Sequence, residues 1–222
     1  MATPILVGSP VASVYTNPLS GAVGSGAVVV VAGCRSQGAG PMATFTATYG
    51  GEAMTSVSQV SNGSDTRRIA VFGKTTPLTG TQSLAITTTD TVRGHGFASY
   101  STVDTATPFG TPATVSATST TPAVTVTATA NDVVLVLLTW GTTATLDTPG
   151  GTVRFSHSED SHNVRLIEVA GDTTVNWSGV FSASTAYVAI GVALKGTAAA
   201  AAADQRSSTR GVGRGLTRGF AG

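Results

Sequence analysis

Short stretches in which apolar and polar residues alternate recur along most of the chain, with Gly or Pro between them. Alternation with a period of two predicts strands that bury one face. Two further runs, 27–32 and 133–138, are apolar throughout and predict strands buried on both faces. Short strands separated by frequent turns are typical of a sandwich or barrel. The alternating stretches are 44–49, 68–72, 83–87, 113–117, 124–128, 164–169, 173–177 and 187–194.

The order of these strands occurs twice. Residues 27–104 and 132–196 each contain an apolar strand, a glycine pair, a strand that starts with arginine, and two closing strands. The glycine pairs begin at Gly50 and Gly150, and the arginines are Arg68 and Arg165. Two interleaved four-strand halves would make a jelly roll, and chance similarity between Thr-, Val- and Gly-rich strands is the alternative. We predict an all-β fold, a two-sheet jelly-roll-like antiparallel β-sandwich with an extended C-terminal arm.

The predicted organisation has three parts: an N-terminal arm at 1–18, the β-sandwich domain at 19–196, and an Ala-rich linker with a Gly/Arg-rich tail at 197–222. In the tail an arginine occupies every fourth position. Interspersed glycines make a helix costly by about 1 kcal/mol each relative to Ala. In an extended chain the arginines would lie on one side, roughly 13 Å apart. This spacing predicts an arm on an acidic partner surface, with a disordered basic tail as the alternative. The candidate partner-binding residues are Arg206, Arg210, Arg214, Arg218 and Phe220.

The composition indicates a protein whose surface is largely covered by partners. Hydrophobic residues make up 41% of the chain, which is enough for a packed core, and charged residues only 10%, against roughly 25% in an average globular protein. So few charges suit a homo-oligomer or a multi-copy assembly. The net charge of +1 argues against specific nucleic-acid binding, and no apolar run approaches the length of a membrane span. No standard signal peptide is apparent, which predicts synthesis in the cytoplasm.

The sequence contains no pattern of residues typical of an enzyme. Its acids are scattered, whereas catalysis would need paired carboxylates or a nucleophile beside a base. The densest polar cluster, 157–162, contains His157, Glu159, Asp160 and His162. Neither face of a strand would carry the four ligands of a structural zinc site, so we interpret the cluster as a solvated loop or interface. We therefore predict no enzyme activity, no cofactor and no metal site.

Several single residues are predicted to belong to the core. Cys34 is the only cysteine, so no internal disulfide can form, and because it follows an apolar run it is expected to be buried. His95 is expected to be a strand histidine, and Trp140 and Trp177 to pack inside. The competing hypothesis, a glycan- or receptor-binding module, would need Trp140 exposed together with Tyr49 or Tyr100 as a stacking platform. Tyr49, Tyr100 and Phe109 are expected to be aromatic residues at loop edges, where they would contribute to an interface.

Two stretches carry a resemblance to a known group. Residues 100–110 read YSTVDTATPFG, and residues 185–195 read TAYVAIGVALK. They resemble β-sandwich domains of structural proteins from tailed bacteriophages and prophages, in which a Y-x-x-V-D-x-x-x-P turn links two halves and an A-I-x-V-A-L-K strand ends the sandwich. The resemblance covers residues 20–196 and carries over no catalytic residues. It implies a virion structural protein assembled in the bacterial cytoplasm.

Within that group we expect a capsid decoration, or cement, protein that bridges and stabilises capsid subunits. Its partners would be the major capsid protein or other virion proteins. The alternative is a tail or fibre module that binds a host receptor or glycan.

Overall fold

The computed structural model describes residues 2–13, 16–38, 44–63, 67–141, 144–159 and 162–197. These residues form strands, turns and loops, with no helix among them, and therefore none that is long and apolar enough to cross a membrane. All named strand pairs are antiparallel. The predicted all-β class with packed antiparallel sheets is confirmed.

The first half of the chain forms an inner and an outer sheet. The inner sheet has the order β1-β9-β3-β7-β6, and the outer sheet β2-β8-β4-β5. Between β5 and β6 the chain crosses from the outer to the inner sheet at Met54. The strands are β1 (Ile5–Ser13), β2 (Leu19–Val23), β3 (Val29–Gln37), β4 (Thr46–Tyr49), β5 (Glu52–Ala53), β6 (Thr55–Ser61), β7 (Arg67–Thr75), β8 (Gly80–Thr87) and β9 (Thr91–Ser101).

The second half follows the same plan. Its inner sheet has the order β10-β18-β12-β15-β14, and its outer layer consists of the pairs β11-β16 and β13-β17. The strands are β10 (Ala113–Ser119), β11 (Ala123–Thr127), β12 (Val133–Trp140), β13 (Leu146–Thr148), β14 (Thr152–Glu159), β15 (His162–Ala170), β16 (Thr174–Ser178), β17 (Val180–Phe181) and β18 (Thr185–Leu194).

The two inner sheets have equivalent strand orders, since β1, β9, β3, β7 and β6 correspond to β10, β18, β12, β15 and β14. The internal repeat predicted from the sequence is therefore present in the topology. The halves are consecutive rather than interleaved: each folds into its own pair of layers. This corrects the expectation of one two-sheet sandwich, because the described residues build two sandwiches in tandem.

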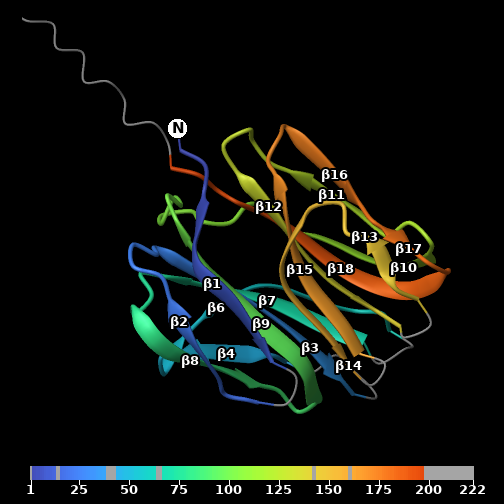
Figure 1. Cartoon of the computed structure of the whole chain (residues 1–222), viewed down its shortest axis with the longest axis horizontal. Coiled ribbons are helices and arrows are strands. Elements are labelled where there is room, and N and C mark those ends of the chain that lie inside the picture. Colours follow the sequence, from blue (N-terminus) through green and yellow to red (C-terminus); the bar gives the residue numbers. More distant parts are fainter. Residues whose placement is uncertain are drawn as a thin grey trace, which may run out of the picture.

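The sandwiches stack so that the molecule has four layers, with the two outer layers on opposite sides (Figure 1). One hydrophobic core lies between the inner sheets, and a second and third lie between each inner sheet and its own outer layer. Because the inner sheets are covered on both sides, their central strands are buried along almost their whole length, as β3 and β12 show. The outer strands β11 and β16 alternate between buried and exposed residues. This is why the sequence contains both fully apolar and alternating strands.

Contacts between the inner sheets follow a pseudo-two-fold pattern. β1 lies against β14, and the equivalent strands β10 and β6 also touch. β9 contacts β14 and β15, just as β18 contacts β6 and β7. Exchanging the halves thus maps each contact onto another, as in an isologous dimer interface. The chain is built like two fused subunits.

A polar contact crosses the core between the two inner sheets. The Tyr100 hydroxyl of β9 donates to Glu168 Oε2 of β15 at 3.0 Å. Glu168 also pairs with Arg154 of β14, whose Nε lies 2.7 Å from Oε2. Burial, and then the charge of Glu168, raise the pKa of Tyr100 well above its usual range, so the tyrosine remains a donor. The contact links one sandwich to the other.

The N-terminal segment expected to form an arm contains an ordered strand. β1 pairs along β9 from Ile5↔Ser101 to Ser13↔His95, with a bulge between Val7 and Val11. It therefore forms an edge of the inner sheet. The expected C-terminal arm beyond Thr197 lies outside the described residues.

Candidate partner-binding surfaces

The described chain begins and ends at the same end of the body, which we call the terminal end (Figure 1). The Ala2 amide donates to the Thr197 carbonyl, and the Thr197 amide donates to the Thr102 carbonyl, both at 3.1 Å. Residues 102–112 link the two sandwiches here. Residues 198–222 therefore continue from a position that hydrogen bonds hold in place.

The linker is anchored along its length to the last strand and the residues after it. The Asp104 amide donates to the Lys195 carbonyl (3.0 Å), the Lys195 amide to the Pro108 carbonyl (2.8 Å), and the Gly110 amide to the Ala193 carbonyl (2.9 Å). Through these contacts the two stretches 100–110 and 185–195 lie side by side. They hold the entry to the second sandwich against its final strand.

Asp104 organises the turn at the start of the linker. Its carboxylate accepts hydrogen bonds from the Thr107 hydroxyl (2.9 Å) and from the amides of Ala106 (2.9 Å) and Thr107 (3.3 Å). These hydrogen bonds, that of the Thr107 hydroxyl first, hold the pKa of Asp104 below its usual value, and the charge of Lys195 contributes in the same direction. Asp104 is therefore a carboxylate at neutral pH.

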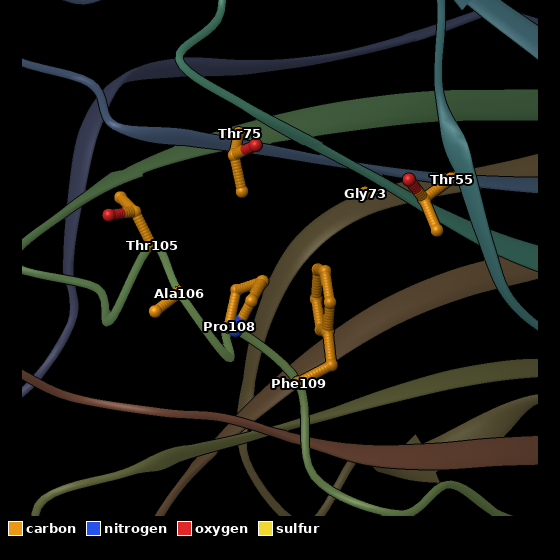
Figure 2. A pocket seen from close by; sticks show the side chains of 7 residues that line it. All are labelled: Thr55, Gly73, Thr75, Thr105, Ala106, Pro108 and Phe109. Atoms are coloured by element: carbon orange, nitrogen blue, oxygen red, sulfur yellow. The ribbon is translucent and has the colours of Figure 1, made fainter.

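Beside this turn lies a hollow of about 350 Å³ between the linker and the edge of the first sandwich, which we call the linker hollow (Figure 2). The Phe109 ring lies against the backbone of Gly73, where an added Cβ would be 2.2 Å from ring atom Cε2. Apolar surface at its base is therefore combined with threonine side chains around the rim. The hollow is lined by Thr55, Gly73, Thr75, Thr105, Ala106, Pro108 and Phe109.

A second hollow, of about 510 Å³, lies on the other side of the linker. Its charged residues are Asp132 and Lys195, and it contains no aromatic residue. Asp132 is committed to the fold, because Oδ2 accepts from the Thr129 amide (2.7 Å) and Oδ1 from the Gly196 amide (3.1 Å). The remaining lining residues are Gly110, Thr111, Thr127, Ala128, Thr129 and Ala193.

The opposite end of the body carries a group of arginines that the sequence analysis did not identify. Arg68 makes a buried ion pair with Asp90, whose carboxylate also accepts from the Ser36 hydroxyl at 2.9 Å. Arg35, in contrast, is 2% exposed, and its Nε and Nη1 have no hydrogen-bond partner among the described residues. Burial, and then the charges of Arg67 and Arg93, lower the pKa of Arg35 to about 9.

The sequence did contain a signal for this group. Alternation along β3 puts Arg35 on the same face as Val29 and Val31, which belong to the core between the inner sheets. The strand pattern alone therefore placed the charge of Arg35 at an inward-facing position.

The polar cluster at 157–162 forms the end of the β14–β15 hairpin. Glu159 pairs with His162 in the backbone ladder, and Asn163 accepts a short hydrogen bond from the Ser158 hydroxyl. Asp160 and Ser161 are outside the described residues. In the part of the chain that the structure describes, no group of three potential metal ligands occurs.

The residues predicted to lie in the core are buried. Cys34 is buried, and burial raises the pKa of its thiol to about 12. His95 is buried too, and burial lowers its pKa to about 4. Trp140 is 1% exposed, and Trp177 is also inside. Tyr49 and Tyr100, which were expected at loop edges, are buried in strands as well, so that expectation is wrong. The aromatic residues named for a glycan platform therefore offer no stacking face in this structure.

The predicted partner-binding residues Arg206, Arg210, Arg214, Arg218 and Phe220 lie outside the described residues, so the structure does not place them. It does place the point from which they continue, at Thr197. The linker hollow was not predicted as a site, although Phe109 was noted as a loop-edge aromatic. Comparison with protein-family models, curated proteins and solved structures found no match for this chain.

Proposed function

We propose that this chain is a structural protein of a bacteriophage particle, a decoration protein that binds the capsid in many copies and stabilises it. Its partner is the major capsid protein or another virion protein, and it joins the particle in the host cytoplasm. The observation that carries the proposal is the fixed origin of the basic tail at Thr197 on a tightly packed body. A packed body that continues into a basic segment can make two linked contacts, which raises avidity without requiring one strong contact.

The strand order supports a jelly-roll-like fold for each sandwich. If β5 and β6 are counted as one fifth strand, the inner sheet of the first half reads 1-8-3-6-5 and the outer sheet 2-7-4-5. Two Greek keys closing on each other produce this order. Such sandwiches are common in viral capsid domains, and the resemblance of 100–110 and 185–195 to phage structural domains agrees with it.

The test is co-sedimentation with capsids that lack this protein. Full-length chain is compared with a chain truncated after Thr197, because Thr197 bonds to Ala2 and Thr102 and must be kept. A full-length variant with all four tail arginines changed to Gln separates charge from tail length. The proposal expects full-length protein to bind and both variants to bind at least tenfold more weakly. Failure of the full-length chain to bind capsids overturns it.

A further inference from the structure

The linker hollow is an open site with a defined chemistry. Phe109 and Pro108 give it an apolar side, and threonines from the linker and from β6 and β7 surround it (Figure 2). Asp104, which belongs to the same turn, is ionised and partly exposed. A ligand that fits has an apolar or aromatic group and a cation a few residues away.

The chain itself contains such a segment. Phe220 stands two residues after Arg218, and residues 204–222 contain four arginines and one acid. The tail is thus basic. At the terminal end Asp104 is partly exposed and Asp172 is exposed, Lys195 acts on Asp104, and Lys74, between the lining residues Gly73 and Thr75, pairs with Glu52. The charge of Asp104 is complementary to that of the tail.

The tail is also within reach of the hollow. It continues from Thr197, which bonds to Thr102, three residues before Thr105 on the rim. The 23 residues from 198 to 220 would span roughly 25–30 Å on average as a flexible chain. A tail segment of that length gives Phe220 an effective concentration of the order of millimolar at the linker hollow. Even a weak contact would then be populated.

We propose that in the free chain the linker hollow binds the chain's own residues 216–222, with Phe220 against Phe109 and Arg218 beside Asp104. The second hollow is the poorer host for Phe220, because it has no aromatic residue. The docked tail is the form that the arm takes when no partner is bound. This inference does not depend on the proposed function, since it concerns the purified chain alone.

Limited trypsin digestion tests the proposal, because trypsin cuts after each tail arginine. The measurement is the rate of cleavage after Arg214 and Arg218 in the full-length chain, followed by mass spectrometry. With millimolar effective concentration and a weak contact, docking should slow cleavage about two- to tenfold. Phe220→Ala should remove this protection, whereas Val212→Ala, the matched control in the same tail, should keep it.

Substitutions that fill one hollow or the other show which of the two binds the tail. Ala106→Trp fills the linker hollow and keeps the backbone hydrogen bond from Ala106 to Asp104. It should release the tail as Phe220→Ala does, and Thr105→Trp serves instead if the first variant does not fold. Thr111→Trp blocks the second hollow and should leave protection unchanged.

Three results would overturn the proposal. The first is equal cleavage rates in wild type, Phe220→Ala and Ala106→Trp. The second is release by Thr111→Trp instead, which would place the tail in the other hollow. The third is protection that increases with protein concentration, which would mean that the tail docks on a second copy. Capsid co-sedimentation is unaffected by these outcomes, so the two proposals fail separately.

Discussion

Replacing Arg35 with methionine should make the protein more stable. Arg35 is almost fully buried, and two of its guanidinium nitrogens lack partners among the described residues. The lowering of its pKa to about 9 corresponds to an upper limit of about 5 kcal/mol of unfavourable charging in the folded state. Relaxation and water reduce this penalty, so we expect Arg35→Met to raise the free energy of unfolding at pH 7 by about 1–3 kcal/mol.

The pH dependence follows from the direction of the shift. Below pH 9 the guanidinium is charged in both folded and unfolded protein, so the penalty is fully present. Above about pH 9 the folded chain loses the proton while the unfolded chain keeps it, so wild-type stability should rise relative to the variant. The advantage of Arg35→Met should therefore be constant from pH 6 to 8 and shrink above 9.

The matched control is Arg68→Met, one strand away. Arg68 forms a buried ion pair with Asp90 at 2.8 Å, and its loss should cost about 3–5 kcal/mol because it leaves a buried carboxylate unpaired. Urea unfolding followed by tryptophan fluorescence measures both variants. If Arg35→Met destabilises the protein as Arg68→Met does, Arg35 has a counterion, and the reasoning is wrong. Asp65 and Asp160, which lie outside the described residues, would be the first acids to examine.

Three further predictions concern the core and the linker. Cys34 is buried with its pKa raised to about 12, so iodoacetamide at pH 8 should modify it only at the rate of unfolding; fast modification of native protein would contradict this. Tyr100→Phe removes the hydrogen bond to Glu168 between the sandwiches and should lower the free energy of unfolding in urea by about 1–3 kcal/mol. The control is Tyr187→Phe, which removes a hydrogen bond to Ala123 within one sandwich and should lower it by less. Gly73→Ala places a Cβ at 2.2 Å from Phe109 and should lower stability by about 1–3 kcal/mol; an unchanged melting temperature would show that the ring moves freely.

The strands were predictable because the burial of a strand determines which of its residues are apolar. Alternation in β11 and β16 and the continuous apolar run in β12 report whether one or both faces are covered. The edge strand β1 was missed, because Gly8 and Pro10 interrupt its pattern where the strand bulges. The linker hollow could not be predicted, since it brings together residues from β6, β7 and the linker that no local pattern connects.

The internal repeat was visible in the sequence, but the sequence did not show directly how its two halves form sheets. The same order of strands arises whether two halves share one pair of sheets or each forms its own, because strand order does not state which strands pair. What decides is the number of strands buried on both faces. A single two-sheet sandwich has no inner layer, so one face of each strand stays in solvent or at an interface. Here β3, β7, β9, β12, β15 and β18 are buried along most of their length, which requires four layers, and the apolar runs 27–32 and 133–138 already indicated two such sheets.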